Sequence, residues 1–196
     1  MMMPNLILAS GSFARQSMLK NAGFVFDVMP ADIDEIAVKD NFNSAFEELA
    51  EELAKQKAIH VSKTSGDAYV VGSDQILIFN DEVLSKAKDT NTAREKLKKL
   101  RGQMHTLISS VCVTRGEEVL FENTQEAHLT MHDFDDDFLE RYIEGAGDIV
   151  TQCVGAYALE STGIQLFSDI KGDYFTILGM PLLPLASFLQ GEGMGL

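Results

Sequence analysis

Apolar residues along this chain fall either into short continuous runs, typical of buried strands, or into a spacing of three and four residues, typical of helices. The longest run covers residues 70–79 and is interrupted by one small polar cluster, Gly72-Ser73-Asp74-Gln75. Open sheets bind ligands where such strands end, so the pattern places Asp74 at the rim of a core. An acid that closes a local turn is the alternative interpretation of the same cluster.

The rest of the pattern predicts alternating strands and helices. Further strands are expected at residues 5–9, 24–28, 83–86, 103–114, 119–131 and 163–170, and helices at residues 13–22, 46–58, 90–100, from 138 onward and at 182–189. Asn80-Asp81 is expected to form a two-residue hairpin turn, which would place Lys86 across from the strand that begins at Asp74. Residues 144–148 are expected to form a loop.

Two helices carry lysines of interest. Lys57 shares a broad face with Leu53 and Ala54, and a lysine in such a position usually extends its charged end back to solvent. The helix at residues 90–100 is expected to turn its apolar residues toward the core and its lysines toward solvent.

The turn Ser10-Gly11-Ser12 joins the first strand to the first helix. In this layout the free N–H groups of a helix amino terminus can bind an anion. Ser12 can cap the helix, and Arg15, one turn inside it, could hold a phosphate. A plain capped helix with a solvated arginine explains the turn equally well. No Gly-Lys-Ser/Thr follows, which argues against a P-loop NTPase.

Two acidic segments could present metal ligands. Asp32-Ile33-Asp34-Glu35 places three acids after a predicted strand, either as a solvated loop or as a source of metal-binding carboxylates. His128, His132 and Asp133 precede three further acids, but acids before a helix are the charge expected at its amino terminus. We therefore favour the capping interpretation for the second segment.

Composition limits the function classes. At 196 residues, with 45% hydrophobic and 23% charged residues, the chain suits one soluble domain or two small lobes. Its net charge of -14 argues against nonspecific binding of nucleic acid or an anionic membrane, and favours a divalent cation as mediator for any polyphosphate ligand. Cys112 and Cys153 have no paired spacing, and no segment is apolar enough to span a membrane, so a cytoplasmic location is expected.

Seven motifs, in this order, resemble those of the Maf family of nucleoside triphosphate pyrophosphatases. They are Leu6-Ile7-Leu8-Ala9-Ser10-Gly11-Ser12 with Arg15, Asp32-Ile33-Asp34-Glu35, Leu53-Ala54-Lys55-Gln56-Lys57-Ala58, Gly72-Ser73-Asp74-Gln75, Ser85-Lys86, Arg101-Gly102-Gln103-Met104-His105 and Gly179-Met180-Pro181-Leu182. The resemblance covers nearly the whole chain. Each motif is weak alone, and their order makes the resemblance specific.

The resemblance implies an α/β fold, with a long curved mixed sheet flanked by helices and two lobes around a central cleft, as a single domain over residues 1–196. It implies hydrolysis of a nucleoside triphosphate between the α and β phosphates, giving a monophosphate and pyrophosphate, with Mg²⁺ or Mn²⁺ as cofactor. A homodimer is common in the family.

The resemblance also implies the roles of individual residues. Glu35 and Asp74 would hold the metal, with Asp74 the proton acceptor, and Lys86 would complete the catalytic set. The substrate would contact the phosphate-binding and base-binding residues Ser10, Ser12, Arg15, Lys57, Gln75 and Glu160. These roles fit the chemistry, because cleavage of a polyphosphate needs cations to mask its charge and a carboxylate to orient or deprotonate water.

Four positions bear on activity and substrate. Ala14 replaces the first arginine of the usual Pro-Arg-Arg, and Ala87 replaces the proline of Gly-Lys-Pro, changes that could weaken phosphate binding. Gln75 and Glu160 are similar to the subgroup directed at 7-methyl-GTP, since a carboxylate beside the base could accept hydrogen bonds from guanine. The alternatives are a dTTP/UTP pyrophosphatase and a nucleotide-binding regulator of septum formation without turnover.

Overall fold

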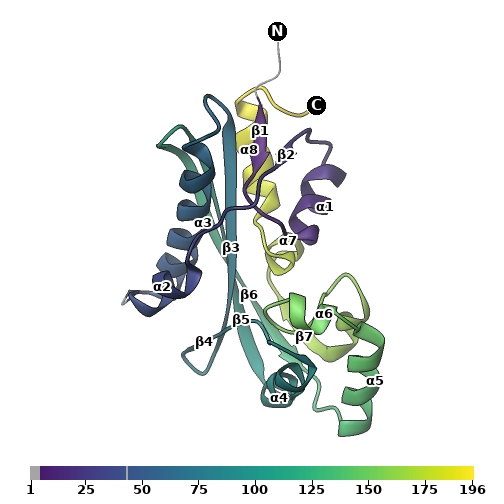
Figure 1. The fold of residues 1–196 in the computed structure, drawn as a ribbon. Helices are drawn as coiled ribbons and strands as arrows, with labels where there is room; N and C mark the ends of the chain where they lie inside the picture. The colour runs from purple at the N-terminus through teal and green to yellow at the C-terminus, as the bar shows by residue number, and fades with distance from the viewer. Residues whose placement is uncertain (1–4, 43) are drawn as a thin grey trace. The chain divides into compact units, whose positions relative to one another are not determined.

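The structure, a computed structural model, describes residues 5–42 and 44–196 (Figure 1). Its elements are β1 (Leu6–Leu8), α1 (Phe13–Asn21), β2 (Asp27–Val28), α2 (Glu35–Asp40), α3 (Phe46–Ser62), β3 (Tyr69–Phe79), β4 (Glu82–Leu84), α4 (Thr90–Leu100), β5 (Met104–Arg115), β6 (Glu118–Met131), α5 (Asp136–Ala146), α6 (Ile149–Gln152), a 3₁₀ helix η1 (Thr162–Leu166), β7 (Phe167–Lys171), α7 (Tyr174–Leu178) and α8 (Leu182–Gly191). Among these residues, no helix has the length and apolar character needed to cross a membrane.

The described strands form a seven-stranded mixed sheet in the order β2-β1-β3-β5-β6-β7, with β4 paired to β3. Strand β1 runs parallel to β2 and to β3, whereas β3 with β4 and β6 with β7 are antiparallel pairs. The predicted α/β fold, with a mixed sheet flanked by helices, is confirmed.

The chain divides into two compact units. Unit 1 comprises Met1–Gln75, Ser109–Gln125 and Gly179–Leu196, and unit 2 comprises Ile76–Ile108 and Glu126–Leu178. Strands β3, β5 and β6 contribute residues to both units. Each unit has a hydrophobic core of its own.

In unit 1, helix α3 packs directly against β3 at Gly72. A Cβ atom added to Gly72 would lie 2.1 Å from the carbonyl oxygen of Ala54 and 2.6 Å from the backbone nitrogen of Ala58. Glycine therefore permits an approach of helix to strand that any larger residue would prevent. The core on this side gathers small and β-branched side chains, namely Ile7, Ala9, Ala54, Ala58, Val61, Ala68, Val70 and Cys112.

In unit 2, β3 and β4 form the predicted hairpin. Asn80 and Asp81 adopt φ angles of 52° and 58°, the left-handed conformation that a two-residue turn of this kind requires. Helix α4 begins after Asp89, whose side chain accepts a hydrogen bond from the backbone of Thr92 at 2.7 Å. The helix packs against α5 and α6, and its apolar residues enter the core of the unit.

Several predicted elements differ from the structure. The strand predicted at residues 24–28 is limited to β2, and the acidic segment before Glu35 leads directly into helix α2. The predicted loop at 144–148 is wrong because α5 continues to Ala146, which is buried at 7% exposure, before ending at Gly147 with a φ of 57°. Residues 162–166 form η1 rather than strand, since Gly163 lies in a tight turn against Ala158.

Candidate functional site

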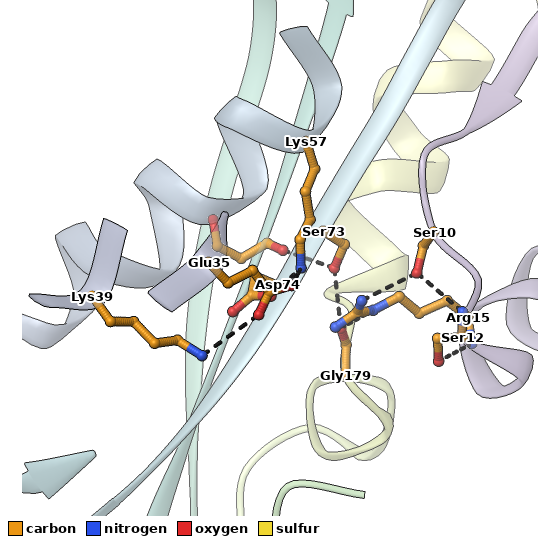
Figure 2. Close-up of polar contacts among 10 residues, drawn as sticks. Ser10, Ser12, Arg15, Glu35, Lys39, Lys57, Ser73, Asp74 and Gly179 are labelled. Atoms are coloured by element: carbon orange, nitrogen blue, oxygen red, sulfur yellow. Dashed lines mark hydrogen bonds and ion pairs between the residues drawn. The ribbon is translucent and has the colours of Figure 1, made fainter. Parts of the chain in front are cut away.

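A buried lysine between two carboxylates forms the centre of the candidate site in unit 1 (Figure 2). The Nζ atom of Lys57 lies 2.7 Å from Oε1 of Glu35 and 2.5 Å from Oδ1 of Asp74. Lys57 is 8% exposed and Asp74 is 5% exposed. The structure thus brings together three of the residues to which charge and metal chemistry were assigned from the sequence, Glu35, Lys57 and Asp74.

Three elements supply this cluster, and their packing explains it. Lys57 lies on the buried face of α3 with Leu53 and Ala54, as its spacing predicts. Its ammonium does not extend to solvent, because the close contact at Gly72 brings α3 within reach of Asp74, two residues further along β3. The expectation of a solvent-directed lysine is therefore wrong, and a ligand role, the minority interpretation of the sequence, fits the geometry.

Glu35 stands at the first position of α2 and lies between two lysines. The helix is capped by Asp34, whose Oδ1 accepts a hydrogen bond from the backbone of Ala37 at 3.0 Å. Oε2 of Glu35 lies 3.5 Å from Nζ of Lys39, one turn further along the helix. Burial would raise the pKa of Glu35, but the charges and hydrogen bonds of Lys57 and Lys39 outweigh it, so the pKa lies below its usual value.

Lys39 is a member of the site that sequence reasoning missed. Its spacing of four residues from Glu35, with the acid nearer the amino terminus, is the pairing that stabilises a helix surface. The signal was present in the sequence, but it becomes readable only once residues 35–40 are known to be helical.

A second cluster surrounds the Ser10-Gly11-Ser12 turn. Ser12 is the N-cap of α1, and its Oγ accepts a hydrogen bond from the backbone of Arg15 at 3.5 Å, which confirms the predicted cap. Nη1 of Arg15 donates to Oγ of Ser10 at 3.2 Å, and Nε donates to the carbonyl oxygen of Gly179 at 2.9 Å. The guanidinium is thereby fixed by partners on both sides.

Gly179 and Ser73 support this arginine. The hydroxyl of Ser73, which is fully buried, lies 3.0 Å from the carbonyl oxygen of Gly179 and 2.8 Å from that of Ser110. Gly179 has a φ of 109°, a conformation that strongly favours glycine. The sequence marked both residues as parts of motifs but gave neither a role. Only the structure shows that they orient Arg15 and connect it to β3.

The two clusters of unit 1 act on each other electrostatically. Burial lowers the pKa of the Arg15 guanidinium, while the charges of Asp74 and Glu35 raise it. Lys57 and Lys39 thus contact the two carboxylates directly, whereas Arg15 acts on them through its charge. Gln75 follows Asp74 on β3, and its side-chain amide donates to Oγ of Ser109 at 3.0 Å.

Lys86 and Glu160 belong to unit 2. Lys86 is exposed and follows β4, which ends at Leu84, so the prediction that this strand extends to residue 86 is wrong. Glu160 is also exposed, in a segment without helix or strand. Burial raises the pKa of Cys153, the charge of Glu160 raises it further and that of Lys86 lowers it.

Glu35 and Asp74 are suited to holding a divalent cation. Both carboxylates already contact the ammonium of Lys57, and carboxylate oxygens are the ligands that Mg²⁺ and Mn²⁺ prefer. In residues 5–42 and 44–196, no group of three or more His, Cys, Asp or Glu side chains is arranged to hold a metal. A cation held by these two carboxylates would need further oxygen ligands from water or from a bound ligand.

The acids at residues 135–137 serve a structural purpose. Oδ1 of Asp135 accepts a hydrogen bond from the backbone of Phe138 at 2.7 Å and so caps α5. The capping interpretation of this segment is confirmed.

Similar sequences extend over nearly the whole chain. A family model with the description "Maf-like protein" matches residues 5–192. A protein named 7-methyl-GTP pyrophosphatase from Brucella abortus is 46% identical over 190 residues, covering 95% of this chain and 96% of the relative. A protein named nucleoside triphosphate pyrophosphatase from Nitrobacter hamburgensis is 43% identical over 190 residues, covering 96% of this chain and 94% of the relative.

A more distant similarity appears among solved structures. The structure of a nucleoside-triphosphatase / dITP/XTP pyrophosphatase from Mycobacterium abscessus is 12% identical, with a TM-score of 0.44, covering 96% of this chain and 95% of that chain.

Proposed function

Because the chain belongs to the Maf-like protein family, we propose that it hydrolyses a nucleoside triphosphate between the α and β phosphates, releasing a nucleoside monophosphate and pyrophosphate. The observation that carries the proposal is the Glu35–Lys57–Asp74 cluster, with Arg15 held beside it. The names of the similar proteins from Brucella abortus and Nitrobacter hamburgensis support the same activity.

The cations of unit 1 suit a triphosphate. Phosphate oxygens repel an attacking nucleophile through their negative charge, and fixed positive groups reduce that barrier most where water is excluded. Arg15 offers a planar set of donors already oriented by Ser10 and Gly179, which limits the entropy lost on binding. Lys57 adds a charge that is almost fully buried.

The carboxylates have two separable tasks. Glu35 and Asp74 would hold Mg²⁺ or Mn²⁺, which would supply charge neutralisation and polarisation of the phosphoryl group. Asp74 is the more buried of the two and contacts Lys57, and we assign to it the acceptance of a proton from the attacking water. Lys57 keeps the Asp74 carboxylate in one orientation through its hydrogen bond.

For the substrate, we propose 7-methyl-GTP. A carboxylate at Glu160 complements the positive charge of a methylated guanine ring better than a neutral amide would, and this side chain is exposed and accessible to a ligand. Lys86, also exposed, is the charge that we assign to the phosphate chain in unit 2. The relative from Brucella abortus is named for 7-methyl-GTP, which favours this nucleotide over dTTP and UTP.

Pyrophosphate release from a panel of nucleotides tests the proposal. We expect turnover with Mg²⁺ or Mn²⁺ to be highest for 7-methyl-GTP, compared with dTTP, UTP, CTP and GTP, and to stop when EDTA removes the metal. Highest turnover with dTTP or UTP would support the pyrophosphatase activity but reject 7-methyl-GTP as the substrate and Glu160 as the residue that selects it. If the nucleotides bind without any release of pyrophosphate, the chain is a nucleotide-binding regulator.

A further inference from the structure

Lys96 of α4 is a buried lysine that has no role in the reaction proposed above. It lies on the core face of the helix with Ala93, Leu97 and Leu100, and only 8% of its surface is exposed. The expectation that the lysines of this helix face solvent is wrong at this position. Spacings of three residues from Ala93 and four to Leu100 place it toward the core, whatever its charge.

The Lys96 ammonium connects two segments of unit 2. It donates hydrogen bonds to the carbonyl oxygen of Ser85 and, at 2.7 Å, to that of Val154. Ser85 immediately precedes Lys86, and Val154 begins the stretch that ends at Glu160. Residues 85–87 and 153–161 have no helix or strand of their own. Their arrangement therefore depends on contacts of this kind.

The second segment is tightly built beyond Val154. A Cβ atom on Gly155 would lie 2.2 Å from the ring of Tyr157, and Ala156 has a φ of 60°. The Ala156 carbonyl oxygen accepts a hydrogen bond from the hydroxyl of Tyr142 at 3.0 Å. The hydroxyl of Tyr157 lies 2.6 Å from Nε2 of His105. The segment is thus fixed to α5 and β5, and Lys96 joins it to the segment of Lys86.

The electrostatics of Cys153 agree with this arrangement. Cys153 directly precedes Val154, and both charges act on the pKa of its half-buried thiol: that of Glu160 raises it and that of Lys86 lowers it. Lysine is suited to the junction because its ammonium has three donors for two convergent carbonyl oxygens.

We propose that Lys96 is a positioning residue whose ammonium holds the segments of Lys86 and Glu160 in one arrangement, and so sets how the protein selects its nucleotide. The inference rests on the proposed function, since it assigns Lys86 to the phosphate chain and Glu160 to the base. A purely structural role would stabilise unit 2 without any effect on the choice of base.

The test compares Lys96→Met and Lys96→Gln with Lys99→Met, a matched control at an exposed position of the same helix. In Lys96→Met, the ratio of kcat/KM for 7-methyl-GTP to that for GTP should fall about 10- to 100-fold, since small displacements of binding groups have effects of this size. Lys96→Gln, which keeps N–H donors, should recover part of the ratio. Lys99→Met should leave it unchanged.

Thiol labelling gives a readout that does not depend on turnover. In Lys96→Met, Cys153 should react several-fold faster with a thiol reagent, because its segment opens more often, while the buried Cys112 should remain slow. The double variant Lys96→Met/Glu160→Gln should lose less of the 7-methyl-GTP to GTP ratio than the two single losses added together. Both changes act through the Glu160 carboxylate, so their effects are not independent.

Each outcome decides one proposal. An unchanged nucleotide ratio in both Lys96 variants, with folded protein and active wild type, overturns the positioning role. A wild type without pyrophosphate release overturns the proposed function instead. In that case the labelling rates still test the junction, and equal rates in Lys96→Met and Lys99→Met would reject it.

Discussion

Lys57 and Lys96 are both 8% exposed, one in unit 1 and the other in unit 2, and they differ in what surrounds the ammonium. Lys57 lies between the carboxylates of Glu35 and Asp74. Lys96 contacts two backbone carbonyl oxygens, and burial lowers its pKa to about 8. The two lysines are therefore equally buried but have different roles.

The partners decide what each lysine can do. Carboxylates can exchange a lysine for a metal ion or take up a proton, so the Lys57 cluster can take part in chemistry. Backbone carbonyl oxygens are fixed in place and do not titrate. A lysine bound to them holds segments together, at the cost of a buried charge without a counter-charge.

The largest expected effect is a loss of turnover, without a matching loss of nucleotide binding, when Asp74 beside Lys57 is changed. Asp74→Asn keeps the shape of the side chain but removes the proton acceptor, so kcat should fall by about 10²- to 10⁴-fold. The Kd for the nucleotide, measured by calorimetry with Mg²⁺, should change little. Turnover equal to that of the wild type would remove Asp74 from the mechanism.

Replacing Lys57 should reduce stability, because its partners are carboxylates rather than the backbone carbonyl oxygens that surround Lys96. Lys57→Met removes the cation that Glu35 and Asp74 share, leaves the almost fully buried Asp74 without an ion pair, and should lower the free energy of unfolding by about 3 kcal/mol. Urea denaturation measures the loss. Millimolar Mg²⁺ should restore part of it, and no difference between Mg²⁺ and EDTA would count against a metal held by Glu35 and Asp74.

Gly72→Ala tests whether the packing of α3 creates the site. The added methyl group would meet the carbonyl oxygen of Ala54 at 2.1 Å, so the helix must move away from β3. We expect a loss of about 1–3 kcal/mol in the free energy of unfolding, together with reduced turnover. Gly145→Ala, where no atom lies within 4 Å of the new Cβ, is the matched control and should not destabilise α5. Full activity in Gly72→Ala would separate helix packing from catalysis.

The lowered pKa of Lys96 predicts a pH dependence with a definite sign. In the unfolded chain this lysine keeps its proton to about pH 10.5, whereas in the folded protein it loses the proton near pH 8. Between these values the unfolded state binds more protons, so the stability of wild type relative to Lys96→Met should rise with pH, by about 2–3 kcal/mol at most. Thermal unfolding of both proteins from pH 7 to pH 10.5 measures the difference. A constant difference would contradict the lowered pKa.

Lys39→Met should have the smallest effect on folding. Its ion pair with Glu35 is partly exposed and lies on one helix, so we expect a loss of only about 0.3–0.5 kcal/mol in the free energy of unfolding. Chemical denaturation of Lys39→Met and Lys57→Met, side by side, measures how much more the buried ion pairs of Lys57 contribute to the free energy of unfolding. A loss as large as that of Lys57→Met would mean that α2 depends on Lys39 for its position.

Much of the local structure was predictable because its causes lie within a few residues. The run at 70–79, the hairpin at Asn80-Asp81 and the cap at Ser12 follow from periodicity and from short polar side chains at turns and helix starts. Helix α2 escaped prediction because the three acids that lead into it, Asp32, Asp34 and Glu35, resemble a loop. Helix α5 was expected to end earlier because Gly145 and Gly147 obscure its last turn.

The sequence by itself determined which groups this protein has for its chemistry, since the motifs around Ser10, Glu35, Lys57 and Asp74 identify the family and the residue types it needs. Only the tertiary structure decided the partners of these groups: the approach of α3 at Gly72 that turns Lys57 to the carboxylates, the carbonyl oxygen of Gly179 that orients Arg15, and the burial of Lys96. The physical reason is range. Helix and turn preferences act between neighbours in the chain, whereas the environment of a buried charge depends on segments as far apart as Arg15 and Gly179, which only the folded packing brings together.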